Sequence, residues 1–411
     1  MTQLTEAPLT PRTEASSPTR LIAAVCAAHF VSHYYIIILA PLLPFVRADY
    51  GVSYTEVGFA IATFNVVSAA LQTPAGFLID RVGARMSLFW GLLLGGAAFL
   101  LAGFVHSFWF LVAMFAVAGV GNTVYHPADY ALLSQHVREQ RIGQAFSVHT
   151  FAGMLGSAVA PPTLLMMQAL WGWRGAFIGA GIMGLVIAAL VLLVRDPVPR
   201  AAARPAVTGD GKTGGAPGGI AMLMSPAILL NLGFFVLLAV MNSGMNNYSV
   251  VALGALFGTP VEIGNTALTC LLMLTAIGVL AGGLLVTRTA LHGAVAGLGL
   301  AGMVATAALI AAFDLHTVLL IVVMSAFGFF SGVIAPSRDM IVREATPPGA
   351  FGRVFGFVTT GFNIGGIVAP MLFGALMDAG QPRWVFIGVA LAALLAVFTV
   401  TTVPKRPRPQ V

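Results

Sequence analysis

Charged residues are scarce in this chain of 411 residues: Asp, Glu, Lys and Arg make up 8% of it, whereas hydrophobic residues make up 58%. Because a soluble protein normally carries about 25% charged residues, this composition excludes an ordinary water-soluble domain. The chain also lacks the G-x-x-x-x-G-K-[ST] loop that cradles nucleotide phosphates. Nothing in the sequence therefore indicates that ATP drives its activity.

Cysteine is nearly absent as well. The two cysteines, Cys26 and Cys270, both lie inside long apolar runs, which argues against a disulfide framework. The chain has no Cys and His spacing of the structural-zinc type. We therefore expect neither a cofactor nor a structural metal site.

Long apolar runs are what the chain has in place of charge. A transmembrane helix needs about 20 mostly apolar residues, and the sequence offers twelve such runs, at 21–46, 56–79, 86–105, 108–134, 143–168, 174–194, 225–250, 263–286, 293–312, 317–340, 352–377 and 384–403. This pattern predicts an all-α integral membrane protein with twelve transmembrane helices embedded in the lipid bilayer.

The net charge of +6 comes from basic residues that are unevenly distributed between the two sides of the predicted membrane. If the N-terminus is cytoplasmic, 16 of the 20 Lys and Arg residues fall in cytoplasmic segments and three on the other face, with Arg338 inside the membrane. Cytoplasmic loops of membrane proteins carry this excess. The first 20 residues do not resemble a signal peptide. We expect a multi-pass protein of the inner (plasma) membrane, with both termini cytoplasmic and no nucleic-acid partner.

A stretch rich in Gly, Pro and Ala divides the chain into two parts. Residues 195–224 are predicted to form a flexible cytoplasmic linker. The linker separates an N-terminal six-helix bundle, 21–194, from a C-terminal six-helix bundle, 225–403. Residues 1–20 are predicted to be a disordered cytoplasmic N-terminus, and residues 404–411 a cytoplasmic tail.

The two predicted bundles share a sequence pattern. At an offset of 209 residues, glycine, proline and phenylalanine recur in the pairs Gly143 and Gly352, Phe146 and Phe355, Gly156 and Gly365, Pro161 and Pro370, and Phe177 and Phe386. A run of matches at one offset indicates two six-helix repeats. Parallel repeats of this kind place a binding site near the middle of the bilayer, between the two halves.

The loop between the second and third spans reads GFLIDRVGAR, residues 76–85. Its Gly76, Asp80, Arg81, Gly83 and Arg85 match the G-x-x-x-D-R-x-G-R-R/K loop motif of the major facilitator superfamily, with alanine at position 84 where the motif usually has arginine. Span count, linker, repeat and motif agree, so the whole chain resembles this superfamily. The resemblance implies the major facilitator fold.

Two roles are open for the residues of this loop motif. The glycines, Gly76 and Gly83, permit close helix approach and a tight turn. The resemblance implies that Asp80, Arg81 and Arg85 form a cytoplasmic gate by pairing with neighbouring helix ends. The alternative is that these three residues only set the topology and cap helices.

Within the superfamily, the chain is most similar to the fosmidomycin-resistance-like exporters. Three stretches carry this resemblance: the His-containing first span that leads to APLLPFV, the stretch FNVVSAALQTPAGFLIDRVG, and GNTVYHPADYALL followed by GQAFSVHTFAGMLGSAVAPP. The superfamily resemblance implies that the first and fourth spans line a central cavity.

Ionisable residues inside a membrane are functional hypotheses. In the first half, His29 and His33 lie four residues apart on one face of the first span, with His33 near the middle of the bilayer. His126, Asp129 and His149 fall in the cytoplasmic third of spans four and five. Imidazoles change charge near neutral pH, so we expect His33 and His29 to couple protons first, with Asp129 next. Each histidine could instead be a core residue bonded to a backbone carbonyl or a hydroxyl.

The second half offers Arg338 and Asp339 in span ten. The repeat places Arg338 opposite Asp129 or its neighbour, so one reading is a salt bridge that closes the cytoplasmic side. The position of Arg338, far along span ten, favours this reading. A counter-charge for an anionic substrate is the other reading. Span seven adds Asn242 and Asn246, which either bind substrate or satisfy a bent helix end.

These features predict a secondary transporter, not an enzyme, that exports a small polar or anionic organic molecule by alternating access with protons as coupling ion. The leading alternative is an importer or exchanger of organic anions such as carboxylates. A third reading makes the histidines and Asp129 a transport site for a divalent metal or a metal chelate. A non-transporting receptor or a lipid flippase is disfavoured, because the loops are compact and a flippase needs lateral openings. We expect a monomer.

Overall fold

A computed structural model describes residues 18–137, 139–194, 220–289, 291–347 and 351–402. Its elements are all helical: α1 (Pro18–Ile37), α2 (Leu43–Tyr50), α3 (Tyr54–Val82), α4 (Ala84–Phe104), α5 (Phe108–Asn122), α6 (Tyr125–His136), α7 (Glu139–Leu193), α8 (Ile220–Leu223), α9 (Pro226–Ser243), the π-helix η1 (Gly244–Tyr248), α10 (Ser249–Phe257), α11 (Val261–Arg288), α12 (His292–Ala312), α13 (Thr317–Ala345), α14 (Phe351–Asp378) and α15 (Arg383–Thr402). The predicted all-α fold is confirmed.

The described helices cross the membrane twelve times. Eleven stretches are long and apolar enough for a span, and one of them is the 50-residue stretch Gln144–Leu193 of α7. At 1.5 Å per residue this stretch would be about 75 Å long, far more than the roughly 30 Å hydrocarbon core. Gly172, with φ 71° and ψ 170°, breaks the helix. Because α7 turns there, it supplies two of the twelve crossings.

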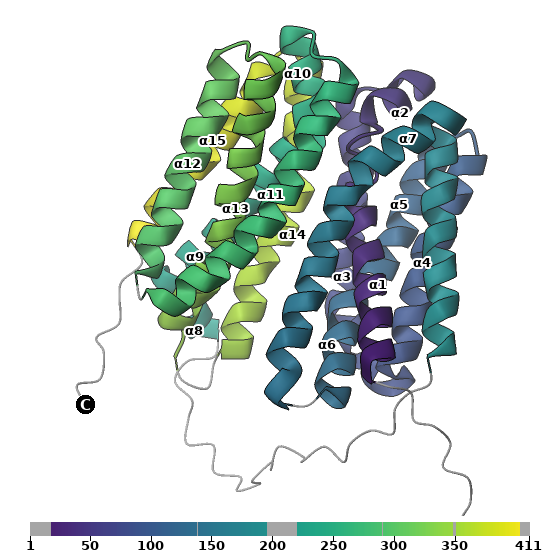
Figure 1. The fold of residues 1–411 in the computed structure, drawn as a ribbon, viewed down its shortest axis with the longest axis vertical. Helices are drawn as coiled ribbons and strands as arrows, with labels where there is room; N and C mark the ends of the chain where they lie inside the picture. Colours follow the sequence, from purple (N-terminus) through teal and green to yellow (C-terminus); the bar gives the residue numbers. More distant parts are fainter. Residues whose placement is uncertain (1–17, 138, 195–219, 290, 348–350, 403–411) are drawn as a thin grey trace, which may run out of the picture.

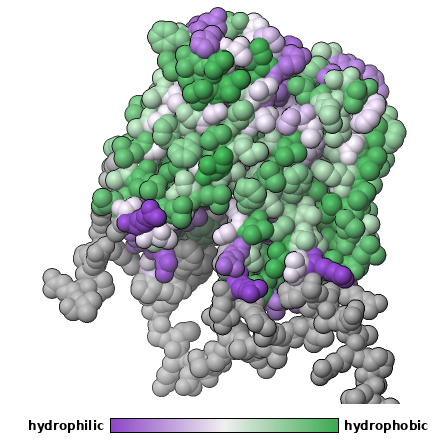
Figure 2. Space-filling view, in the orientation of Figure 1, coloured by the Kyte–Doolittle hydropathy of each residue, from purple (hydrophilic) through white to green (hydrophobic). Residues whose placement is uncertain are grey.

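The surface of the bundle suits a bilayer. In Figure 2, hydrophobic residues cover most of the visible side of the molecule, and hydrophilic residues gather toward its two ends. Large apolar side chains such as Trp90, Phe104 and Leu298 are 50%, 66% and 75% exposed. Exposed apolar surface on this scale would be costly in water and is favourable in lipid. The chain is therefore a multi-pass membrane protein.

Two helical bundles stand side by side, one built from α1–α7 and the other from α8–α15 (Figure 1). Equivalent helices pack together in each: α3 on α5 and α11 on α13, α1 on α7 and α9 on α14, α4 on α7 and α12 on α15. The repeat-related Phe177 and Phe386 are both completely buried. The fold thus follows the predicted six-helix repeat. The exact limits of the two bundles stay a prediction, and the termini 1–17 and 403–411 and linker residues 195–219 lie outside the described residues.

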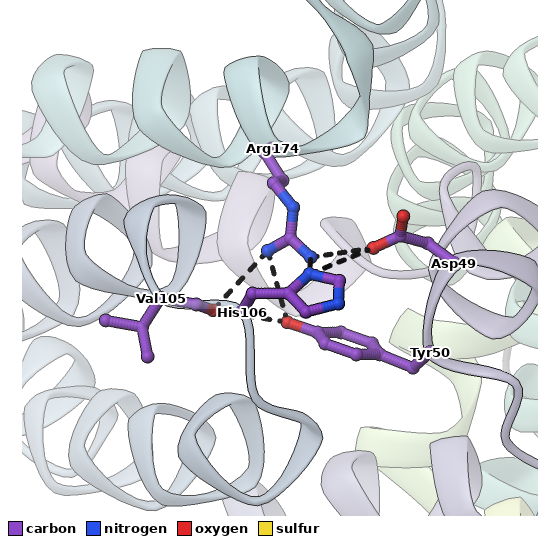
Figure 3. Close-up of polar contacts among 5 residues, drawn as sticks. All are labelled: Asp49, Tyr50, Val105, His106 and Arg174. Atoms are coloured by element: carbon purple, nitrogen blue, oxygen red, sulfur yellow. Dashed lines mark hydrogen bonds and ion pairs between the residues drawn. The ribbon is translucent and has the colours of Figure 1, made fainter.

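A cluster around Arg174 fastens the first bundle where α7 turns (Figure 3). The Arg174 guanidinium donates to Asp49 Oδ2 at 2.7 Å, to the Tyr50 hydroxyl at 3.3 Å and to the carbonyl oxygen of Val105 at 3.4 Å. It also contacts the His106 ring. Arg174 therefore ties α2 and the α4–α5 connection to the start of the second α7 segment.

The second bundle repeats part of this arrangement. Arg383 begins α15 and donates to the carbonyl oxygen of Ala311, near the end of α12. It lies 209 residues after Arg174, which bonds Val105 just after α4. Arg174 and Arg383 are thus a further pair related by the repeat. Their offset of 209 residues could have revealed this pair from the sequence alone.

The two bundles touch most closely at the face opposite the chain ends, here named the distal face; the face where α1 begins and α15 ends is the terminal face. Helices α3 and α14 pack across the junction. The Asp378 carboxylate, at the end of α14, accepts hydrogen bonds from the backbone N–H groups of Tyr54 and Thr55, both at 2.8 Å. A helix N-terminus favours such an anion, so Asp378 caps α3 from the other half.

Glycines allow this close approach. A Cβ on Gly58 would lie 2.5 Å from the carbonyl oxygen of Pro370, and one on Gly374 would lie 2.7 Å from that of Tyr54. Nearer the terminal face, Phe77 and Leu78 of α3 are 69% and 51% exposed. The tightest packing between the halves therefore lies at the distal face.

We predict that Asp378→Ala weakens this distal contact. Loss of a cap costs about 1 kcal/mol, which corresponds to a roughly fivefold shift toward separated halves. Spin labels at Val52→Cys and Gln381→Cys, with Cys26 and Cys270 replaced by serine, should show a larger population of long distances by pulsed electron resonance.

The matched control for this variant is Glu262→Gln. Glu262 is an exposed carboxylate in the first turn of α11, within its own half, so its removal should leave the distance distribution unchanged. Equal distributions for Asp378→Ala and the parent protein would show that this cap does not hold the halves together.

Candidate functional site

Three polar side chains from three helices meet in the interior of the first bundle. His29 of α1, Asp129 of α6 and His149 of α7 are 3%, 0% and 1% exposed. Asp129 Oδ2 lies 2.9 Å from His149 Nε2 and 3.4 Å from His29 Nδ1. The two imidazole rings stack with centroids 3.7 Å apart. We call these three residues the Asp–His cluster.

Two further histidines extend the Asp–His cluster. The His33 ring centroid is 4.6 Å from that of His29, and the His126 ring centroid is 5.1 Å from it. His33 Nδ1 lies 3.3 Å from the hydroxyl of Ser157. His126 is exposed although it lies within a membrane-spanning segment. The structure thus brings together all five ionisable residues that the sequence singled out in this half.

Small residues and a helix break make room for this arrangement. A Cβ on Gly153 of α7 would lie 2.6 Å from the His29 ring and 2.9 Å from the His33 ring. One on Gly156 would lie 2.1 Å from the carbonyl oxygen of Phe30. The fourth span is interrupted between α5 and α6, and His126 is the second residue of α6. Only glycine allows α1 to approach α7 this closely.

The buried charge of Asp129 limits which protonation states the Asp–His cluster can adopt. Asp129 Oδ1 and His149 Nδ1 are buried with no hydrogen-bond partner among the described residues. An unpaired carboxylate in a bundle interior is strongly unfavourable, so the Asp–His cluster needs at least one proton or another cation. Its three possible ligand atoms lie within 4.8 Å of one another. Imidazole and carboxylate groups could therefore also hold a divalent transition metal ion.

Arg338 does not pair with Asp129. Its Nε and Nη2 atoms both lie 2.8 Å from Oδ1 of the neighbouring Asp339. Its guanidinium lies over the rings of Phe235 and Phe362, 4.8 and 5.4 Å from their centroids. The expected salt bridge between halves is absent from this conformation, because Asp129 is completely buried against α1 and α7.

The loop motif is placed at the terminal ends of α3 and α4. Gly83, with φ 90°, forms the tight turn between them. Arg85 donates to the carbonyl oxygens of Leu192 and Val194, at 3.2 and 2.7 Å, and so caps the end of α7. This contact with a neighbouring helix end fits both the gate reading and the helix-capping reading. Arg81 is exposed, and the side chain of Asp80 lies outside the described part.

Gly76 does not have the expected role in helix approach. A Cβ at this position would meet no other atom within 4 Å. The reason is that α3 packs tightly on α14 at the distal face, whereas Gly76 lies near the terminal end of α3.

The asparagines of the seventh span lie at a π-helical turn. Asn242 is exposed at the end of α9, and Asn246 is half-buried in η1. A π-helical turn inside an α-helix is rare and is frequent at functional sites. The sequence around Gly244, with its asparagines, does not by itself predict a π-helical turn.

Sequence reasoning missed two residues beside the Asp–His cluster. Tyr130 is 47% exposed, and its ring centroid lies 5.7 Å from that of His149 and 6.1 Å from that of His126. Ser157 bonds His33. The spacing of Tyr130, four residues after His126, could have indicated a shared helix face.

We predict that Gly153→Ala destabilises the protein by about 1–3 kcal/mol, the usual cost of overpacking. The His29 ring cannot yield freely, because it is stacked on His149. Thermal unfolding of the detergent-purified chain measures the effect.

Gly297→Ala in α12 is the matched control, since a Cβ there meets no atom within 4 Å. It should leave stability unchanged or raise it by up to about 1 kcal/mol, because alanine favours a helix more than glycine does. If both variants unfold at the same temperature, the imidazoles are not held as tightly as the structure indicates.

Comparison with known families shows a match along most of the chain. The sequence profile described as the Major Facilitator Superfamily matches residues 25–237 and 232–411. The first matched segment covers most of α1 through α7 and extends into α9, and the second runs from within α9 to residue 411.

Three relatives that are named for a compound align with part of the chain. A probable L-galactonate transporter of Escherichia coli K12 is 30% identical over 35% of this chain and 32% of its own length. A probable sulfoacetate transporter of Cupriavidus necator is 29% identical over 40% of this chain and 38% of its own length. The fosmidomycin resistance protein of Escherichia coli K12 is 22% identical over 44% of each chain. The alignments thus span less than half of each of these relatives.

Solved structures share the whole fold. The nucleoside transporter NupG has a TM-score of 0.75 at 13% identity, covering 94% of this chain and all of that one. A bacterial homologue of the human lysosomal transporter Spinster, in an inward-facing and occupied conformation, has a TM-score of 0.71 at 13% identity, over 94% of this chain and 96% of that one.

Proposed function

This chain belongs to the major facilitator superfamily, and from that premise we propose that it is a proton-coupled secondary transporter that exports a small organic anion. That it is a transporter of small organic compounds, and not an enzyme, follows from the family. Protons as coupling ion, an anionic substrate and the outward direction are the proposal.

The Asp–His cluster is the observation that carries the proposal. A coupled transporter needs a group that changes its protonation state while the surrounding helices exclude water. Asp129, His149 and His29 form such a group, because they are buried and in mutual contact and the carboxylate must be neutralised. Imidazole is the side chain that gains and loses a proton near neutral pH.

A route between the Asp–His cluster and water supports the same proposal. His29 is in ring contact with His126, which is exposed. A polar, exposed side chain in a membrane-spanning segment is unfavourable in lipid and favourable beside a water-filled space. We place this space between the two halves, where rocking of the repeats would expose it to each side in turn.

An anionic substrate is supported by the relatives. Two of them are named for the organic anions L-galactonate and sulfoacetate. Export is supported by the likeness to the fosmidomycin resistance protein. We further place the terminal face in the cytoplasm of an inner-membrane monomer, because the basic residues of the sequence concentrate there. An importer or exchanger of organic anions differs from this proposal only in direction.

Proteoliposomes with an imposed pH gradient test the proposal. Asp129→Asn and His149→Ala should abolish substrate movement driven by the gradient, because the proton-holding site is lost. Both variants should keep substrate exchange in the absence of a gradient, which shows that they are folded. A pH-sensitive dye inside the vesicles measures proton flux alongside radiolabelled galactonate or sulfoacetate.

His316→Ala is the control, since His316 is exposed in the connection before α13 and should behave as the parent protein. Gradient-driven transport that survives in Asp129→Asn would rule out the Asp–His cluster as the coupling site. Transport that stops with a chelator and returns only with added Zn²⁺ would favour a metal ion as the cargo or coupling ion instead.

A further inference from the structure

Arg338 is a cation in a membrane-spanning helix, and among the described residues its charge is balanced only by its own neighbour in sequence, Asp339. We propose that Arg338 is the anchor for the acidic group of the substrate, and that Asp339 occupies this anchor when no substrate is bound. This inference rests on the proposed function, in which the substrate is an organic anion. It adds the residue that binds the anion and the residue that competes with it.

The Arg338–Asp339 pair has poor geometry for a permanent salt bridge. Neighbouring side chains on a helix point about 100° apart, and here two guanidinium nitrogens share the single oxygen Oδ1 of Asp339, both at 2.8 Å. The favourable arrangement gives each N–H its own carboxylate oxygen. A carboxylate that arrives from outside the helix can adopt this two-oxygen arrangement, and it would bind Arg338 better than Asp339 does.

Two aromatic rings hold the guanidinium in place without neutralising it. Phe235 of α9 and Phe362 of α14 lie 4.8 and 5.4 Å from the guanidinium carbon, measured to the ring centroids. Both distances fall within the range of a cation–π contact. Arg338 is therefore positioned by two helices and keeps its charge for an anion.

The pair lies beside the space between the halves. Asp339 is 46% exposed, and it is close enough to Tyr130 of the first half to interact with it electrostatically. Tyr130 in turn lies against His126 and His149. An anion on Arg338 would thus be adjacent to the elements that hold the Asp–His cluster.

Repeat symmetry places the cation and the cluster carboxylate at one depth. Arg338 follows Asp129 by 209 residues, the offset of the repeat. Each lies seven residues before the end of its helix, α13 at Ala345 and α6 at His136, which is about 10 Å along the axis. A substrate anion on Arg338 is therefore level with the proton site across the junction.

The planar fork of arginine fits a carboxylate best, so we assign a small carboxylate as the substrate. Sulfonates and phosphonates offer a tetrahedral group to the same donors and should bind less tightly. A neutral compound of the same size should not bind at this anchor.

Substrate binding to the purified full-length chain in nanodiscs tests the assignment without any gradient. The probes are galactonate, sulfoacetate and, as the neutral match, galactose, measured by calorimetric titration. Arg338→Ala should weaken galactonate binding at least about tenfold, and Arg338→Lys should recover part of it. Asp339→Asn should tighten binding by about threefold to tenfold, because it removes the internal competitor.

Arg343→Ala is the matched control, an exposed arginine on the same helix, and should bind galactonate as the parent protein does. The gain expected for Asp339→Asn cannot arise from misfolding. Equal affinity in Arg338→Ala and the parent, or weaker binding in Asp339→Asn, would overturn the anchor alone. A parent protein that binds neither acidic probe would overturn the anionic substrate as well, whereas loss of proton coupling would leave this binding result intact.

Discussion

The carboxylate of Asp129 is the constraint on which the rest of the first bundle depends. It is completely buried, so its charge must be neutralised by groups that other helices supply. His29 and His149 come from α1 and α7, and Gly153 leaves the space that lets these two helices approach. Burying a carboxylate among imidazoles destabilises the fold, and in a transporter such destabilisation is expected at the site of ion coupling.

The two repeats share a scaffold and differ in their chemistry. Arg174 and Arg383 occupy equivalent positions and fasten equivalent connections in the two bundles. At another repeat-related pair, the first half carries Asp129 and the second half carries Arg338. One bundle therefore holds the groups suited to a cation such as the proton, and the other holds a cation suited to an anion. This division places two opposite charges level with each other across the junction.

The two halves are joined by their close contact at the distal face. Asp378 caps α3 from the other half, and Gly58 and Gly374 allow the two backbones to approach. Capping bonds can be broken and reformed without unfolding either bundle, because the helices within each bundle also pack on one another. Movement of the halves about this junction would change access to both charges together.

Apolar run lengths determined the twelve crossings, because they report how residues partition between lipid and water. Matches at a 209-residue offset determined the repeat, and the loop motif at residues 76–85 carried the resemblance to the family. The same reading listed every member of the Asp–His cluster. It could not decide that Asp129 faces His149 and not Arg338, that Arg85 caps α7, or that Gly76 faces open space. These pairings depend on how helices far apart in sequence rotate and pack, and hydropathy carries no information about which face of one helix meets which face of another. The tertiary structure alone decided them, through the space that glycines leave and the need to satisfy buried charge.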